Sequence, residues 1–236
     1  MIAAGPWTVE QQRLAAAARA VEEVKDGMVV GLGTGSTAAL AIEALGARIA
    51  AGLRITSIPT SERSAALAAQ LRIPRTDFAA HYRLDLTIDG ADEVEPRSRS
   101  LIKGRGGALL REKIVAAASE RVIVVVDESK LVPHLGARGM LPVEIVSFGW
   151  QTVLERLARH GLAPRLRSAG GEPFVTDGGN YIADCAIEML SSPATLDAQL
   201  ASIVGVVETG LFLGLASAVI VGRSTGVEVL DRKSVV

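Results

Sequence analysis

A glycine-rich segment near the start of the chain has the composition of an anion-binding loop. Residues 31–37 read Gly-Leu-Gly-Thr-Gly-Ser-Thr and follow a short apolar run at 28–30. Glycine lets the backbone approach an anion closely, and the N-terminus of a following helix offers free N–H groups and a positive dipole end. Ser36 and Thr37 add hydroxyl donors. The segment therefore predicts a phosphate cradle, and the alternative is a tight strand-to-helix turn with capping hydroxyls.

The same segment disfavours two common cofactors. No lysine follows in the spacing of the ATP-binding P-loop, and the third glycine comes one residue early for the dinucleotide fingerprint. His81, His134 and His160 do not form a metal-ligand spacing, and the single cysteine, Cys185, excludes a Cys-rich zinc site. We therefore expect neither a nucleotide cofactor nor a metal.

An acidic segment follows the apolar run at 85–88, which is a predicted strand. It reads Asp89-Gly90-Ala91-Asp92-Glu93. Ligands of open α/β sheets bind at the carboxyl ends of the strands. Three carboxylates in five residues repel one another unless they serve a substrate or a cation, and crowding raises the pKa of a carboxyl group toward the range useful for acid–base catalysis. The segment is a candidate for proton transfer, and the alternative is a solvated acidic turn.

A second glycine-rich segment carries two cations and precedes another carboxylate. Residues 101–107 read Leu-Ile-Lys-Gly-Arg-Gly-Gly and lead into a helical segment that holds Glu112. Lys103 is a candidate for neutralising a developing oxyanion. Taken alone, Glu112 is better explained as a surface carboxylate paired with Arg111 or Lys113.

Composition places the chain among ordinary globular proteins, with 49% hydrophobic residues, 22% charged residues and a net charge of −1. A nucleic-acid or membrane-surface protein would carry a basic footprint, which this composition disfavours. We expect no signal peptide and, with one cysteine, a cytoplasmic location. Residues 203–222 are apolar enough to suggest a membrane span, but Glu208 and several glycines favour two buried strands around a turn.

Strand and helix signals alternate through the first half of the chain. Predicted strands lie near residues 28–30, 54–58, 85–88 and 122–126. Predicted helices begin at the capping box of Thr8 and Gln11 and lie at 37–51, 61–71 and 108–118. The first helix is expected to bury the face of Leu14, Ala18, Val21 and Val24, and the fourth to turn Glu112 away from Leu110 and Ile114. This alternation predicts a parallel sheet covered on both faces.

From about residue 141 the pattern approaches β-α-β-β-α-β, the ferredoxin-like order. It includes a hairpin predicted around the Asp-Gly-Gly-Asn turn at 177–180. The segments 218–221 and 227–230 are expected to rejoin the first sheet. We therefore predict an α/β fold: a Rossmann-like parallel-sheet domain at 1–140 and 210–236, with an inserted smaller ferredoxin-like α+β domain at 141–209.

Together these segments resemble the type A family of ribose-5-phosphate isomerases along nearly the whole chain. The blocks that carry the resemblance are Gly-Thr-Gly-Ser-Thr at 33–37, Asp-Gly-Ala-Asp-Glu at 89–93, Lys-Gly-x-Gly at 103–106, Arg-Glu-Lys at 111–113 and Asp-x-Ser-Lys at 127–130, with Leu-Pro-Val-Glu at 141–144 and Val-Thr-Asp-x-Gly-Asn at 175–180 also similar. The resemblance implies interconversion of D-ribose 5-phosphate and D-ribulose 5-phosphate through an enediolate, in the non-oxidative pentose phosphate pathway, without cofactor or metal.

The resemblance also implies roles for individual residues. Glu112 would be the catalytic base. The sugar would be held by Asp89, Gly90, Ala91, Asp92, Lys103, Gly104, Arg105 and Gly106. The phosphate would be held by Thr34, Gly35, Ser36, Thr37 and Lys130, with Arg13 as a further basic contact. From the chemistry, we assign ring opening to Asp89, oxyanion stabilisation to Lys103, and orientation of Lys103 or a substrate hydroxyl to Asp92.

Three positions depart from the family pattern. Arg105 replaces a glycine, Gly107 an alanine and Leu110 a common threonine, so the side chain of Arg105 could point to solvent or contact the substrate.

Two other functions are alternatives to the isomerase. One is a sugar-phosphate sensor domain, and the other is an acyl-CoA transferase with a glutamate nucleophile. We expect a homodimer or homotetramer built through the small domain, with no nucleic-acid or membrane partner.

Overall fold

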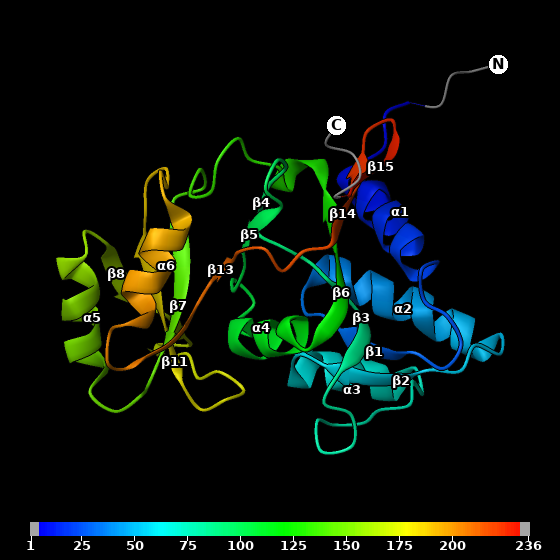
Figure 1. Ribbon diagram of the computed structural model, residues 1–236, viewed down its shortest axis with the longest axis horizontal. Coiled ribbons are helices and arrows are strands. Elements are labelled where there is room, and N and C mark those ends of the chain that lie inside the picture. Colours follow the sequence, from blue (N-terminus) through cyan, green and yellow to red (C-terminus); the bar gives the residue numbers. More distant parts are fainter. Residues whose placement is uncertain (1–4, 232–236) are drawn as a thin grey trace. The chain divides into compact units, whose positions relative to one another are not determined.

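The structure, a computed structural model, describes residues 5–231 (Figure 1). Its contacts divide the chain into two compact units. The first unit comprises the chain up to Ala91, the segment Val115–Leu131 and the chain from Leu215 onward. The second unit comprises Asp92–Ile114 and Val132–Gly214. This division differs from the expected boundaries at 141 and 209, because strands within 92–114 pair with a strand that precedes Gly214.

A six-stranded sheet forms the centre of the first unit. In spatial order its strands are β15 (Gly226–Asp231), β14 (Ala218–Arg223), β6 (Ser119–Asp127), β3 (Leu84–Asp89), β1 (Val29–Leu32) and β2 (Thr56–Pro59). All neighbours are parallel except β14 and β15, which pair antiparallel at the edge. The predicted parallel sheet is confirmed, and the C-terminal strands rejoin it as expected.

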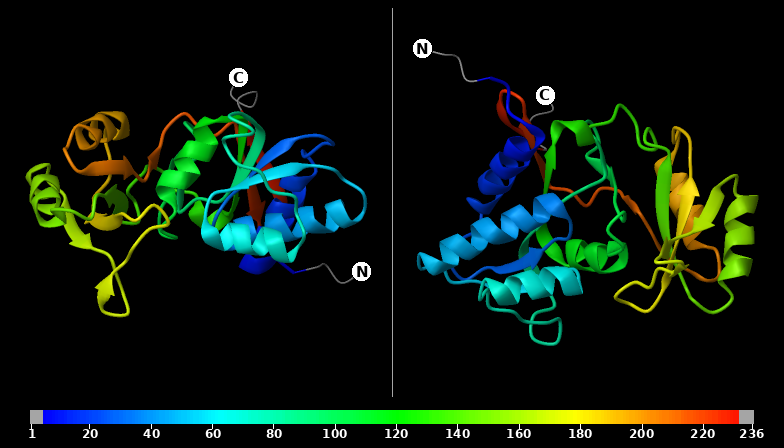
Figure 2. Two further views of the ribbon diagram at one scale, coloured as in Figure 1. Left: turned by 90° about the horizontal axis from the view of Figure 1, so that it is seen from below. Right: turned by 180° about the vertical axis from the view of Figure 1, so that it is seen from behind.

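Helices α1 (Val9–Val21), α2 (Ser36–Ala50) and α3 (Glu62–Gln70) belong to the first unit, and α4 (Leu109–Ala117) enters it at Val115 (Figure 2). The predicted capping box is confirmed, since the N–H of Thr8 donates to the side chain of Gln11 at 2.8 Å. One hydrophobic cluster joins α1 and α2 to alternate residues of the sheet. In a smaller cluster, Val115 of α4 packs with residues of β2 and β3.

Helix α1 packs by a face of small residues. Its fully buried alanines are Ala16, Ala17 and Ala20. Leu14 is 55% exposed, and Ala18 is exposed as well. Of the predicted face, Val21 and Val24 are buried, and the prediction is wrong for Leu14 and Ala18. Alanines at the contact let the helix axis approach the sheet closely, which a leucine at that place would prevent.

A four-stranded antiparallel sheet dominates the second unit. Its spatial order is β12 (Val206–Thr209), β7 (Met140–Ile145), β11 (Tyr181–Ala186) and β8 (Ala163–Leu166). Helices α5 (Trp150–Arg159) and α6 (Pro193–Ala201) complete the order β7-α5-β8-β11-α6-β12 along the chain. This is the split β-α-β arrangement of ferredoxin-like units, so the predicted α+β insertion is confirmed.

Short strands account for the remaining differences from the expected pattern. The hairpin predicted around 177–180 is wrong: β10 (Glu172–Pro173) pairs with β9 (Ser168–Ala169), because β7 and β8 already occupy both edges of β11. A three-stranded sheet, unpredicted, joins β13 (Leu211–Phe212), β5 (Ser100–Ile102) and β4 (Glu93–Glu95). The segment 203–222 contains strands, and within residues 5–231 no helix is long and apolar enough to cross a membrane.

Candidate active site

Asp89, at the end of β3, is a buried carboxylate that fixes the glycine-rich loop of the first unit. Its Oδ1 accepts the N–H of Thr34 at 3.0 Å and the N–H of Gly90 at 2.7 Å. The residue is 3% exposed. Gly33 passes so close that an added Cβ would lie 2.2 Å from the same oxygen. Only glycine permits this approach, so part of the glycine pattern serves Asp89 rather than a ligand.

The N-terminus of α2 has the features of an anion site. Gly35 precedes the helix with φ +113°, and among the described residues no side chain caps this helix end. Ser36 is exposed and Thr37 is buried. The first-turn N–H groups, the helix dipole and the hydroxyl of Ser36 together suit a phosphate group. A cavity of about 340 Å³ adjoins this loop, and Gly35 and Arg63 are among its lining residues.

The hydroxyl of Thr34 is engaged inside the first unit. Its Oγ1 lies 2.7 Å from Oγ of Ser61 and 2.8 Å from Oγ1 of Thr60. Ser64 donates in turn to the carbonyl of Gly33 at 2.6 Å. This hydroxyl cluster supports the loop from beneath. The sequence prediction missed Ser61 and Ser64, although their position at the start of a helix marked Ser61 as a cap.

Arg13 lies beside the turn that carries Lys130. Its Nε donates to Oδ2 of Asp127 at 2.7 Å, and Asp127 ends β6 and caps the 3-10 turn η1 (Glu128–Lys130). The N–H of Ser129 donates to Oδ1 of Asp127 at 3.0 Å, and the hydroxyl of Ser129 also donates there. Burial opposes the charge of Asp127, yet the Ser129 and Arg13 bonds hold the pKa of this carboxyl below its usual value.

The predicted substrate-binding residues of the first unit lie at the carboxyl ends of neighbouring strands. Strand β3 lies between β1 and β6 and is parallel to both. Neighbouring strands are about 4.8 Å apart, so the ends of β1 and β6 are separated by about 10 Å. The glycine-rich loop, Asp89 and η1 follow these three strand ends. Ligands of open α/β sheets bind at these carboxyl ends of the strands.

Glu112 of α4 is buried in the second unit beside Lys103. Its Oε2 lies 3.3 Å from Nζ of Lys103, and each side chain is 5% exposed. Ile114, two residues later, is 47% exposed. The helix therefore buries a carboxylate and exposes an isoleucine. Burying an ion pair costs desolvation energy that apolar packing would not, so this arrangement favours a role in chemistry.

The alternative of a surface carboxylate is wrong for Glu112, because its side chain is only 5% exposed. Its two cationic neighbours bind other segments. Lys113 donates to Glu208 at 2.7 Å, and Arg111 donates to the carbonyl of Asp177 at 2.9 Å. Both cations are thus held by segments that follow β7 in the chain.

The backbone of β13 and the residue before it hold Lys103 in place. The N–H of Lys103 donates to the carbonyl of Gly210 at 2.9 Å, and a Cβ on Gly210 would lie 2.4 Å from the carbonyl of Lys103. The ammonium lies 5.5 Å from the ring centroid of Phe212. The sequence analysis did not predict a role for Gly210 or Phe212, since nothing in a two-residue strand indicates which strand it pairs with.

Asp92 fixes the loop after Lys103. Its Oδ2 accepts the N–H of Arg105 at 3.0 Å. The side chain of Arg105 is exposed, which explains how an arginine is tolerated in place of a glycine. Gly104, at φ +110°, and Gly107, at φ +80°, have backbone conformations that favour glycine. The other predicted sugar contacts, Gly90, Ala91 and Gly106, are half-buried, half-buried and exposed respectively.

The block at 175–180 supports α4 beside Glu112. Buried Glu144 accepts hydrogen bonds from Thr176 at 2.9 Å and from Asn180 at 3.0 Å through Oε1. Asp177, in the same loop, receives the hydrogen bond of Arg111. These residues lie in sequence blocks that the resemblance included without a role.

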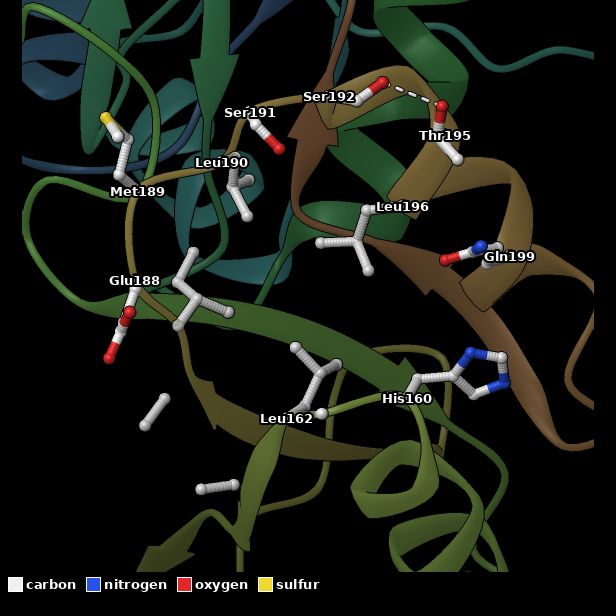
Figure 3. Close-up of a pocket in the computed structure, with 14 residues that line it drawn as sticks. His160, Leu162, Glu188, Met189, Leu190, Ser191, Ser192, Thr195, Leu196 and Gln199 are labelled. Carbon is white, nitrogen blue, oxygen red and sulfur yellow. Dashed lines mark hydrogen bonds between the residues drawn. The ribbon is translucent and has the colours of Figure 1, made fainter.

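A separate cavity of about 580 Å³ lies in the second unit (Figure 3). Leucines 162, 190 and 196 line it together with His160 and Gln199, and Ser192 and Thr195 hydrogen-bond at 2.7 Å beside it. It contains no predicted site residue, so it is distinct from the candidate active site. Within residues 5–231, no group of three or more His, Cys, Asp or Glu residues is placed to hold a metal ion.

The fold and these sites define an α/β enzyme that has a glycine-rich loop suited to an anion at the carboxyl ends of its parallel strands and a buried carboxylate–ammonium pair suited to proton transfer. The profile of the family described as Ribose 5-phosphate isomerase A (phosphoriboisomerase A) matches residues 56–226. The chain belongs to this family.

Similarity to known members extends over most of the chain. It is 57% identical over 215 residues to Ribose-5-phosphate isomerase A of Gloeobacter violaceus, covering 91% of this chain and 94% of that protein. The structure of ribose 5-phosphate isomerase A from Methanocaldococcus jannaschii is 40% identical with a TM-score of 0.91, covering 95% and 100% of the two chains. A D-ribose-5-phosphate isomerase in complex with phospho-erythronic acid is 37% identical with a TM-score of 0.92, covering 96% and 100%. The predicted family and fold class are confirmed.

Proposed function

We propose that this chain interconverts D-ribose 5-phosphate and D-ribulose 5-phosphate in the non-oxidative pentose phosphate pathway. The observation that carries the proposal is the buried pair of Glu112 and Lys103, 3.3 Å apart, in a member of this family. Phospho-erythronic acid, bound to a similar enzyme, supports it as well. Its carboxylate bears a negative charge where an enediolate of the five-carbon sugar would bear one.

Glu112 moves the proton in this proposal. An open-chain aldose loses the proton on C2 to the carboxylate, the C–H electrons form the C1–C2 double bond, and the former aldehyde oxygen takes the negative charge. The protonated carboxyl then returns the proton to C1, and the proton of the C2 hydroxyl passes to the O1 oxyanion, so that C2 becomes the ketone and C1 carries a hydroxyl. One carboxylate can serve both carbons because they are adjacent. The ammonium of Lys103 stabilises the enediolate oxygen.

Two aspartates serve the sugar hydroxyls. Asp89 transfers protons during ring opening, and its orientation is set by the N–H groups of Thr34 and Gly90. Asp92 orients the substrate through the loop that it holds at Arg105. Asp89 is the last residue of β3, and Asp92 follows three residues later in the same acidic segment.

The phosphate group of the substrate is the anchor. Gly35, Ser36 and Thr37 offer N–H and hydroxyl donors at the start of α2, and Lys130 adds a positive charge. Arg13 contributes a second positive charge beside η1, partly offset by Asp127. Binding energy from this end of the substrate positions the reacting carbons without being part of the chemistry.

The test is ketose formation from D-ribose 5-phosphate by purified protein in the presence of EDTA, beside the Glu112→Gln variant. Glutamine keeps the shape of the side chain but cannot accept the proton, so we expect kcat to fall about 10²–10⁴-fold. Glu120→Gln changes an exposed glutamate of β6 and is the matched control. Circular dichroism establishes that each variant is folded.

A folded Glu112→Gln variant with the kcat of the wild type would show that Glu112 is not the base. If the wild type produces no ketose while D-ribose 5-phosphate raises its melting temperature, the chain is a sugar-phosphate sensor instead. We further propose a cytoplasmic homodimer or homotetramer. Exposed apolar side chains of the second unit, among them Phe148 and Val204, support an association surface there.

A further inference from the structure

Arg167 has a fixed backbone directly after β8. Its N–H donates to the carbonyl of Ile182 at 2.8 Å, and its carbonyl accepts the N–H of Phe174 at 2.9 Å. Its side chain is only 13% exposed. Neither the sequence patterns nor the blocks of the family resemblance assigned it a role. An arginine that is largely buried and whose backbone N–H and C=O are both hydrogen-bonded has a defined position within the second unit.

The guanidinium of Arg167 joins β11 to the loop that follows Lys103. Its Nε donates to Oδ2 of Asp184 at 2.9 Å, and its Nη2 donates to the other oxygen of the same carboxylate. Its Nη1 donates to the carbonyls of Gly104 at 2.9 Å and Arg105 at 3.1 Å. Only arginine offers donors in such a planar fork, whereas a lysine has a single nitrogen.

These two carbonyl bonds determine which way the loop presents its N–H groups. In a trans peptide the C=O and the following N–H point in opposite directions. Because the carbonyl of Gly104 faces Arg167, the N–H of Arg105 points away from it, and it donates to Asp92 at 3.0 Å. By the same geometry, the N–H of Gly106 points away from Arg167.

Packing around the loop supports the same orientation. The ring of Phe174 lies 5.8 Å from the guanidinium of Arg167 and leaves no room for a side chain at Gly107, where an added Cβ would lie 2.4 Å from the ring. Asp92 holds one side of the loop and Arg167 holds the other. The chain between Lys103 and α4 therefore has little freedom to change its path.

We propose that Arg167, oriented by Asp184, is a positioning residue for isomerisation. It holds the carbonyls of Gly104 and Arg105, and so sets the direction of the Gly106 N–H and the place of Lys103 beside Glu112. This inference rests on the proposed function. Arg167 does not touch the reacting atoms; it acts through the loop.

The test compares Arg167→Lys with the wild type and with Arg165→Lys, which makes the same change at an exposed arginine two residues earlier. We expect kcat/KM for D-ribose 5-phosphate to fall about 10–100-fold in Arg167→Lys, since small misplacement of binding groups has effects of this size. We also expect faster hydrogen exchange at residues 105–107, with residues 182–184 unchanged. Arg165→Lys should match the wild type in both measurements.

A folded Arg167→Lys protein with the kinetics and loop exchange of the wild type would overturn the inference. Asp184→Asn is the second variant if Arg167→Lys does not fold: it weakens the anchor but keeps the guanidinium, so loop exchange should rise with a smaller loss of kcat/KM. Unchanged exchange and kinetics there would also overturn it. Absence of ketose formation by the wild type would instead refute the proposed function, and the exchange data would still decide whether Arg167 holds the loop.

Discussion

Single side chains decide how charge is kept inside each unit. In the first unit, Asp127 is completely buried and is stabilised as an anion by Arg13 and Ser129. In the second unit, Glu112 and Lys103 are buried side by side. Desolvation opposes each charge, and the partner offsets that cost. Removing one member of such a pair therefore has a larger effect than removing one member of an exposed pair.

Asp127→Asn tests this at the residue scale. The pKa of Asp127 is below its ordinary 3.8 in the folded protein, so its ionised form stabilises the fold above that pH, and the contribution is lost as the pH falls through the folded-state pKa. We expect the variant to be less stable by about 1–3 kcal/mol near neutral pH. Urea unfolding of both proteins should show this difference shrinking in acid. A difference that stays constant with pH would contradict the assignment.

At the scale of elements, close approach of backbones replaces bulky packing at two places. Gly33 lets the loop after β1 lie against Asp89, and the alanine face of α1 lets that helix lie against β14. Gly222 of β14 completes the second contact, because an added Cβ would lie 1.9 Å from the carbonyl of Gln12 in α1. Helix α4 buries Leu109, Val115 and Ala116 as an amphipathic helix does, but it also buries Glu112 and exposes Ile114.

Gly222→Ala tests the contact of α1 with β14. The added methyl group meets backbone rather than a flexible side chain, so helix or strand must shift, and we expect a loss of about 1–3 kcal/mol. Gly5→Ala is the matched control, since nothing lies within 4 Å of its added Cβ. Thermal unfolding followed by circular dichroism measures both. Equal melting temperatures for the two variants would show that the contact is loose.

At the scale of the whole molecule, each unit is built from more than one segment of the chain. It leaves the first unit after Ala91, returns at Val115, leaves again after Leu131 and returns at Leu215. The acidic segment 89–93 and α4 are both crossed by these boundaries. The second unit also exposes apolar side chains, with Phe148 94% exposed and Val204 78% exposed.

Sedimentation equilibrium tests the proposed assembly. We expect a mass of two or four chains, because exposed apolar side chains of this size commonly mark association surfaces. Phe148→Glu should weaken the association if its ring is part of the surface, while Leu14→Glu, on the exposed side of α1, serves as the comparison. Monomer alone at all concentrations would contradict the proposal.

Much of the fold could be predicted from local patterns. Apolar runs and capping signals located the strands β1, β3 and β6 and the helices around them, since these depend on residues close in sequence. The order β-α-β-β-α-β predicted the ferredoxin-like sheet of the second unit for the same reason. The hairpin at 177–180 failed because the turn signal is local, whereas the choice of partner for β11 depends on β7 and β8.

The sequence by itself determined the family, the residue types available for acid–base chemistry and the glycine positions of both loops. Tertiary structure alone decided which of these residues lie in contact. It buries Glu112 against Lys103, places Gly33 against Asp89, and lets Arg167 donate hydrogen bonds to the loop after Lys103. These contacts join residues that are 9, 56 and 63 positions apart, and no local periodicity encodes them. Side-chain burial and pairing follow from how elements pack, and packing is a property of the folded chain.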